Sequence, residues 1–539
     1  MRMTSSITIF DTTLRDGTQG EGISLTAEDK IKIARKLDEL GIHYIEGGNP
    51  FSNGKDMEFF KRVRELNLKA KITAFGSTRR KNTTCEQDDN LRQLIEAKTP
   101  AATLVGKTWD FHVHTALQTT LEENLAMIYE SVAYVNRHGI ETIFDAEHFF
   151  DGFKANPEYA LAALRKAKEA GAAWIVLCDT NGGSLPNEIY DIVTRVVAEI
   201  DAPIGIHTHN DCELAVANTL AAVTAGARQV QGTINGYGER CGNANLCSII
   251  PNLQLKMGYK IITDEQMKML TSTARYVSEI ANVIMPVGQP YVGNAAFAHK
   301  GGIHVSAILK DSKTYEHIEP ELVGNKRRVL VSELAGQSNI ISKAQQMGLD
   351  VNAAQSRAMI ERVKELEHQG YSFEGADASL ELLIRDAFGQ TKDIFTVESF
   401  KMTVEKTASG IVSEAIVKVR VGDQLVYTVA EGNGPVNALD NALRKALIDF
   451  YPDIRKVHLT DYKVRVLDEK DATAAKVRVL IESSDFKETW STVGVSSNVI
   501  EASWEALVDS IRYALLDMTK NDIQPAAAVQ LESAGIVNF

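Results

Sequence analysis

The stretch ITIFDTT (7–13), followed by TAEDKIKIARKLDEL (26–40), shows the unit from which the first half of the chain is built. The first segment is a short apolar run, as is typical of a buried strand. The second repeats apolar residues at helical spacing, starts at Thr26, a favourable N-cap residue, and ends before Gly41, a common helix stop. The two segments therefore predict a strand followed by an amphipathic helix.

The same alternation continues through the first half of the chain, where a second clear helical segment, TLEENLAMIYESVAYVNRHG (120–139), also ends in glycine. Eight strand candidates occur, at 7–13, 44–48, 71–76, 101–106, 141–148, 174–180, 204–210 and 229–236. Eight strand–helix units in about 250 residues predict a (β/α)8 barrel. A doubly wound open sheet is the alternative. We favour the barrel because polar motifs follow many different strands, and only a closed barrel brings all those strand ends to one site.

Beyond the barrel the chain first becomes mostly helical, up to about residue 395, and the pattern then changes again. Alternating strands at 413–422 and 424–432 lead into a helix at 435–450, and a weaker copy follows with strands at 476–484 and 487–495 and a helix near 499–517. This indicates an internal β-β-α repeat in a small α+β domain. The repeat is interpreted either as a plain dimerisation module or as an effector-binding domain.

The whole chain is thus predicted to form a TIM barrel, mostly helical linker subdomains and a C-terminal α+β domain. The predicted boundaries are 1–270 for the catalytic barrel, 271–395 for the linker subdomains and 396–539 for the regulatory or dimerisation domain. A chain of 539 residues is too long for one ordinary core, which agrees with several domains.

Charge and cysteine usage narrow the class of protein. The net charge of -13 argues against nucleic acid or an anionic membrane as a partner, because phosphates would be repelled. We find no signal-peptide core at the N-terminus and no apolar run of about 18 residues that would span a membrane. The five cysteines are scattered without a CxxC pair and are interpreted as reduced thiols. We therefore expect a cytoplasmic protein.

One candidate site combines residues from distant parts of the sequence. His207 and His209 occupy positions i and i+2 of a strand and so share a face. Alone, such a pair is interpreted more readily as hydrogen-bonded core histidines than as metal ligands. Asp16, however, ends the first strand, and Asn243 follows the eighth. Because strands seven, eight and one are neighbours in a closed barrel, these four side chains are expected to converge.

The chemistry of this set indicates a divalent metal. Two imidazoles, one carboxylate and one amide oxygen suit Zn²⁺, Mn²⁺, Mg²⁺ or Co²⁺ and leave two positions of an octahedron open. A 2-keto acid can chelate there through its ketone and carboxylate oxygens, and the metal then polarises the ketone. Arg15 is placed to stabilise a developing alkoxide, or else forms a structural salt bridge. Thr180 is interpreted as a substrate-carboxylate ligand, as a helix N-cap, or as both.

Three motifs, DTTLRDG (11–17), HTHND (207–211) and GERCGNANL (238–246), together resemble the DRE-TIM metallolyases. Within that group the chain is similar to the 2-isopropylmalate, homocitrate and citramalate synthases, and the resemblance covers essentially its whole length. Stretches such as FDAEHFFDGFKANPEYAL (144–161) and LCDTNGG (177–183) are most similar to the longer bacterial citramalate synthases.

The resemblance implies site residues as well. It implies metal ligation by Asp16, His207, His209 and Asn243 and a catalytic Arg15 beside the ketone oxygen. It matches the family's barrel carboxylate to Glu147, although Asp145 lies on the same face and remains an alternative. In FAHKGGIHVSA (297–307), His304 resembles the histidine that deprotonates acetyl-CoA, and Tyr315 resembles its tyrosine partner.

The implied activity is that of an acyltransferase of the 2.3.3 class in isoleucine biosynthesis. It would condense acetyl-CoA with pyruvate to (R)-citramalate and release CoA. A 2-isopropylmalate or homocitrate synthase, acting on a larger keto acid, is the alternative. The family precedent further implies a homodimer and feedback by a branched-chain amino acid, here isoleucine, at AEGNGPVNAL (430–439) in the C-terminal domain.

Overall fold

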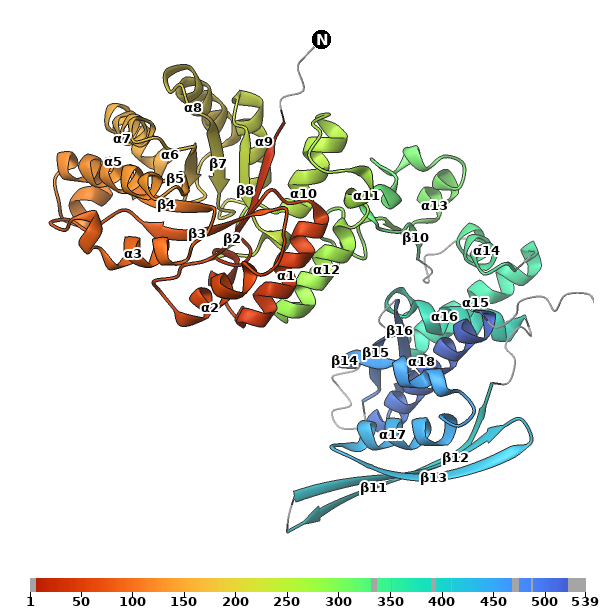
Figure 1. Cartoon of the computed structure of the whole chain (residues 1–539). Coiled ribbons are helices and arrows are strands. Elements are labelled where there is room, and N and C mark those ends of the chain that lie inside the picture. Colours follow the sequence, from red (N-terminus) through yellow and green to blue (C-terminus); the bar gives the residue numbers. More distant parts are fainter. Residues whose placement is uncertain are drawn as a thin grey trace, which may run out of the picture. The chain divides into compact units, whose positions relative to one another are not determined.

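The structure is a computed structural model that describes residues 6–330, 337–349, 351–388, 394–408, 410–467, 475–485 and 488–521. It divides into two compact units (Figure 1). Met1–Phe297 and Ile318–Arg327 form the first, and Ala298–His317 and Arg328–Phe539 form the second. The predicted linker, 271–395, is divided between these two units, and the three predicted domain boundaries stay a prediction.

The first unit is a closed barrel of eight parallel strands in sequence order, with β8 paired to β1. The strands are β1 (Thr8–Asp11), β2 (Tyr44–Gly48), β3 (Lys71–Ser77), β4 (Ala101–Lys107), β5 (Glu141–Glu147), β6 (Trp174–Asp179), β7 (Ile204–Thr208) and β8 (Gln229–Gly232). The predicted barrel is confirmed, and the open-sheet alternative is wrong.

Helices follow the strands and cover the outside of the barrel (Figure 1). The main ones are α1 (Ala27–Leu40), α2 (Gly54–Val63), α3 (Asp89–Glu96), α5 (Leu121–Arg137), α7 (Pro157–Glu169), α8 (Pro186–Glu199) and α9 (Ala215–Ala225). As predicted, Thr26 caps α1, in a capping box with Asp29. Gly41 ends the helix with φ 92°, a left-handed conformation that glycine adopts without strain.

The inside of the barrel has an apolar part and a polar part. An apolar cluster, separate from the main core, contains Phe10, Tyr44, Ala101, Ile143, Val176 and Cys178. Because side chains alternate along a strand, the next inward positions lie two residues further on. On β2 and β5 those positions are Glu46 and Asp145, and the corresponding position beyond the end of β6 is Thr180. The carboxyl ends of the strands therefore present polar groups to one common space.

The second unit contains helices α13 (Gly302–Ile308), α14 (Gln337–Gln346), α15 (Ala353–Gln369) and α16 (Asp377–Ala387) and the predicted α+β repeat. The first copy is β11 (Thr396–Thr407), β12 (Gly410–Val421), β13 (Gln424–Gly432) and α17 (Pro435–Leu447). The second copy is β14 (His458–Val466), β15 (Val477–Ser484), β16 (Thr489–Ser496) and α18 (Val499–Asn521).

Each copy is therefore β-β-β-α and not β-β-α, because a third strand, β11 or β14, precedes the predicted pair. Both extra strands lie at the edge of an antiparallel sheet and are exposed along most of their length. An edge strand that buries few side chains has little apolar alternation for sequence reasoning to detect.

Among the described helices, none is long and apolar enough to cross a membrane.

Candidate metal centre and active-site cavity

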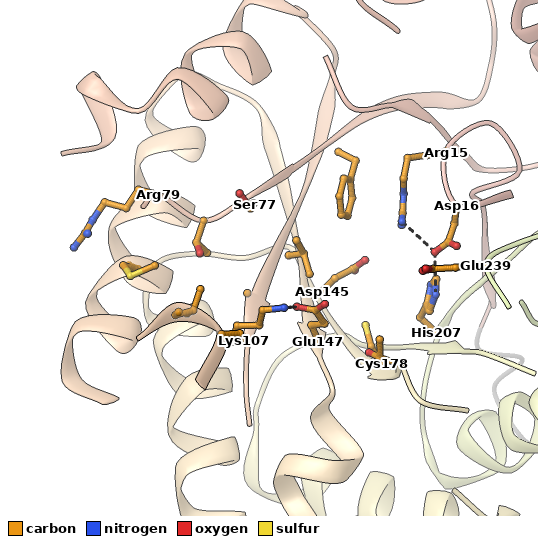
Figure 2. A pocket seen from close by; sticks show the side chains of 18 of the residues that line it. Arg15, Asp16, Ser77, Arg79, Lys107, Asp145, Glu147, Cys178, His207 and Glu239 are labelled. Carbon is orange, nitrogen blue, oxygen red and sulfur yellow. Dashed lines mark hydrogen bonds and ion pairs between the residues drawn. The ribbon is translucent and has the colours of Figure 1, made fainter. Parts of the chain in front are cut away.

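A cavity of about 740 Å³ opens at the carboxyl ends of the barrel strands. Asp16, His207 and His209 line it, together with Glu147 and Arg79. In Figure 2 the Asp16–His207 group lies on one side, the Lys107–Glu147 pair in the middle and Arg79 on the far side. The cavity therefore extends well beyond the candidate ligands and has room for a substrate larger than a small keto acid.

The four predicted ligands come together at one end of this cavity. Nε2 of His207 lies 3.5 Å from Oδ2 of Asp16 and 3.4 Å from Nε2 of His209. One ligand atom from each of these three residues lies within 4.8 Å of the others, and all three are buried. Asn243 joins them by donating from Nδ2 to Oδ1 of Asp16 at 3.0 Å.

An orphaned polar atom supports a cation at this point. Oδ1 of Asn243 is buried and has no hydrogen-bond partner within the described part of the chain. A buried polar atom without a partner is costly unless an ion or water satisfies it. Two imidazole nitrogens that face each other beside a carboxylate also suit a shared cation. The residues present therefore fit the predicted metal.

The electrostatics hold these groups in the protonation state that a metal needs. Burial raises the pKa of Asp16, but Arg15 and the two imidazoles outweigh that effect and lower it to about 2. Burial lowers the pKa of His209 to about 4 and also lowers that of His207. At neutral pH the site thus has a carboxylate and two neutral imidazoles, the forms that ligate metal.

Arg15 is fixed on three sides. Its Nε donates to Oε2 of Glu46 at 2.6 Å, and its Nη1 donates to Oδ2 of Asp16 at 3.0 Å. The guanidinium also lies 4.0 Å from the centre of the Phe75 ring. The salt-bridge alternative is thus present in the structure, yet Arg15 also lines the cavity. Sequence reasoning missed Glu46 and Phe75, although a carboxylate inside the buried strand YIEGG (44–48) was a visible signal.

The two candidate carboxylates of β5 have different surroundings. Glu147 is paired with Lys107. Asp145 is only 3% exposed, accepts a hydrogen bond from Nε2 of Gln231 at 3.1 Å, and has its pKa raised to about 8 by burial. Both line the cavity. Asp145 is hydrogen-bonded to the buried amide of Gln231, whereas Glu147 pairs with the partly exposed ammonium group of Lys107. This contrast favours Glu147 as the residue that meets a substrate.

Thr180 follows β6 and lines the same cavity. Its hydroxyl oxygen accepts a hydrogen bond from the backbone N–H of His148 at 2.9 Å. The next helix, α8, has Leu185 at its N-cap position, so the N-cap alternative for Thr180 is wrong. Since the Thr180 oxygen already accepts one bond, its proton is the group free to bind an anion.

Comparison with known proteins agrees with this architecture. Family models match in order along the chain: HMGL-like at 6–277, homocitrate synthase post-HMGL domain-like at 291–371, and LeuA allosteric (dimerisation) domain at 374–515. An (R)-citramalate synthase from Aquifex aeolicus is 57% identical, with 95% of this chain and 98% of the relative covered. One from Geobacter sulfurreducens is 55% identical, with 95% and 98% covered. The chain belongs to the (R)-citramalate synthase family.

A second group of relatives is more distant. A probable 2-isopropylmalate synthase from Methanopyrus kandleri is 34% identical, with 94% of this chain and 98% of the relative covered. The same domain order thus extends over two kinds of synthase. The citramalate synthase family is metal-dependent, which agrees with the buried cluster of Asp16, His207 and His209.

The two remaining family-implied residues, His304 and Tyr315, lie in the second unit. His304 is on α13, and Tyr315 follows a short 3-10 turn, Ser312–Thr314. Their rings stack with centroids 4.0 Å apart and an interplanar angle of 22°. Both are exposed, Tyr315 by 46%. The structure brings these two residues together, and their relation to the barrel site stays a prediction.

Proposed function

We propose that this chain condenses acetyl-CoA with pyruvate and hydrolyses the resulting thioester, giving (R)-citramalate and CoA. The main supporting observation is the buried set of Asp16, His207, His209 and Asn243, which opens onto a cavity of about 740 Å³. The choice of pyruvate is supported by five (R)-citramalate synthases at 48–57% identity, against 33–34% for 2-isopropylmalate synthases.

In this proposal Asp16, His207, His209 and Asn243 hold a divalent metal. A bound Mn²⁺, Mg²⁺, Zn²⁺ or Co²⁺ ion would polarise the ketone of a 2-keto acid. Arg15 directs its guanidinium at the ketone oxygen, where negative charge develops, and its contacts with Glu46 and Phe75 fix it there before the substrate arrives. The Thr180 hydroxyl donates its free proton to the substrate carboxylate.

His304 is assigned to the proton transfer. It accepts a methyl proton from acetyl-CoA, and the electron pair of that C–H bond forms the new bond to the ketone carbon. Tyr315 holds the imidazole plane by stacking, and Glu147 is the barrel carboxylate of this step. The ketone oxygen becomes an alkoxide opposite Arg15 and takes up a proton. Water then attacks the thioester carbonyl, and the thiol of CoA leaves, so the overall reaction is driven forward.

The test is release of CoA thiol from acetyl-CoA with pyruvate, 2-ketoisovalerate and 2-ketoglutarate in separate assays, with and without a chelator. We expect the highest kcat/KM with pyruvate and loss of turnover on chelation, restored by added metal. Each added methylene is worth about 1–3 kcal/mol in such a pocket, so preferences of 10- to 200-fold are measurable. A higher kcat/KM with 2-ketoisovalerate would instead support a 2-isopropylmalate synthase.

We further propose a homodimer formed through the C-terminal domain (396–539) and feedback inhibition by isoleucine in that domain. The LeuA allosteric (dimerisation) model at 374–515 supports both. In the motif AEGNGPVNAL (430–439), a Cβ at Gly432 would lie 2.4 Å from the backbone nitrogen of Ala438, so only glycine permits this close turn into α17. Isoleucine titration that changes neither turnover nor melting temperature would remove the feedback proposal. A monomeric mass in solution would remove the dimer.

The division into a barrel (1–270), linker (271–395) and regulatory domain (396–539) belongs to the same proposal. We also place the enzyme in the cytoplasm, because its five cysteines are all free thiols and two of them, Cys212 and Cys241, are exposed. Fractionation of cells that express the tagged chain tests this location.

A further inference from the structure

A hydrogen-bonded chain of buried side chains crosses the inside of the barrel behind the metal-ligand candidates. It runs from His207 on β7 through Gln231 on β8 to Asp145 on β5. His207 and Gln231 are register partners on neighbouring strands, whereas β5 lies three strands away around the ring. All three residues are less than 5% exposed. The amide of Gln231 therefore connects a ligand candidate on β7 with a carboxyl group on β5, across the lumen.

The partners of Gln231 determine how its amide is oriented. Nε2 donates to Oδ1 of Asp145 at 3.1 Å and to Oε1 of Gln229 at 3.4 Å. An amide nitrogen donates and cannot accept, so this orientation satisfies both contacts. The amide oxygen, Oε1, then faces Nδ1 of His207 at 2.9 Å.

The same network determines which nitrogen of His207 has the proton. Because Oε1 of Gln231 can only accept, Nδ1 of His207 must donate to it. Nε2 of the neutral ring is then left with a lone pair. That nitrogen is the one that faces Asp16 and His209. His207 is thus prepared as a ligand before any metal binds.

We propose that Gln231 is a positioning residue for the metal centre, which fixes the tautomer and the ring orientation of His207, and that Asp145 prevents its amide from flipping. This inference rests on the proposed metal site. It gives Asp145 a structural role in place of the catalytic one that sequence reasoning left open. His209 contrasts with His207, since its Nδ1 has no partner among the described residues. The orientation of the His207 ring therefore depends on Gln231.

The first experiment compares Gln231→Met with Gln229→Met, a matched control on the same strand and face. Both glutamines are almost completely buried, and methionine has a similar volume but cannot hydrogen-bond. Affinity for Co²⁺ and Zn²⁺ is measured by competition with a chromophoric chelator, and the visible absorption of Co²⁺ reports ligand geometry. We expect Gln231→Met to weaken binding about 10- to 100-fold and to change the Co²⁺ spectrum. Gln229→Met should stay within about 3-fold of the parent.

Gln231→Glu is the rescue variant, because it keeps an oxygen that accepts from His207 and, when protonated, still donates to Asp145. We expect its metal affinity to stay within about 3-fold of the parent or to increase. An equal loss in both methionine variants, or in the glutamate and methionine variants at position 231, would overturn the proposal. A parent that binds no metal, or His207→Ala binding as tightly as the parent, would instead count against the metal centre itself.

A second measurement needs no variant at the glutamine. Long-range ¹H–¹⁵N correlation spectra of the metal-free parent, with His207 assigned through His207→Asn, report which ring nitrogen is protonated. We expect a single tautomer with the proton on Nδ1. A proton on Nε2, or a mixture of tautomers, would overturn the proposal even if Gln231→Met does not fold.

Discussion

The same resemblance implied the candidate metal centre and the His304–Tyr315 pair, but the two regions differ in burial and in hydrogen bonding. At the metal centre, ligand candidates on β7 and in the segments that follow β1, β7 and β8 are buried and hydrogen-bonded. His304 and Tyr315 are exposed and stack on each other beside a helix of seven residues. Substitutions at the first region should change metal binding and rate together. Substitutions at the second should change only rate.

The largest effect is expected from removal of a ligand. His209→Ala should lower kcat/KM by about 10³-fold or more, because polarisation of the ketone by metal is worth several kcal/mol. Metal content of the purified protein should decrease in parallel. His138→Ala removes an exposed imidazole at the end of α5 and is the matched control. Retention of metal and turnover by His209→Ala would place the metal elsewhere.

Arg15→Lys should have the next largest effect, a decrease of about 10²- to 10³-fold in kcat. Lysine keeps the charge but cannot both pair with Glu46 and place a flat cation over Phe75. Metal affinity should remain close to that of the parent, and this separates the role of Arg15 from that of the ligands. A loss of less than 10-fold would indicate that the pairing with Glu46 is only structural.

His304→Ala should lower turnover by about 10²-fold, as expected when a general base is lost. Since the side chain is exposed, melting temperature and metal affinity should not change. Tyr315→Phe keeps the stacked ring and should cost about 10-fold or less. Turnover of His304→Ala within a few-fold of the parent, with an intact fold, would exclude His304 from the mechanism.

The smallest effect on activity is expected from a half-buried carboxylate outside both regions. Asp509 of α18 accepts a hydrogen bond from Ser379 of α16 at 2.8 Å, and burial raises its pKa to about 6. The folded state therefore prefers the protonated form. Stability of the second unit should fall as pH rises from about 4 through 6, by about 1.4 kcal/mol for each unit of pKa shift.

Asp509→Asn should remove that pH dependence and raise the melting temperature at pH 7 relative to the parent. Turnover should change by less than about 2-fold, because the residue lies in a helix contact and not in the cavity. Thermal unfolding of parent and variant at pH 4.5 and pH 7 checks this. Parallel pH profiles for the two proteins would contradict it.

The strands could be predicted because each is a short apolar run followed by polar residues, and their number determined the barrel. His207, His209, Asp16 and Asn243 could be predicted because strand order alone makes β7, β8 and β1 neighbours. Glu46 and Gln231 were missed because their roles depend on which side chains they meet across the lumen. Strands β11 and β14 were missed because they bury few side chains.

The strict sequence order of the barrel strands has a consequence for how such enzymes diversify. The metal is assigned to one arc of the ring, β8, β7 and the end of β1, while Ser77 and Val105 line the cavity from β3 and β4. Mutations that reshape the second arc leave the first untouched. After gene duplication, one copy can therefore gain specificity for a different keto acid while its metal-ligand residues stay unchanged.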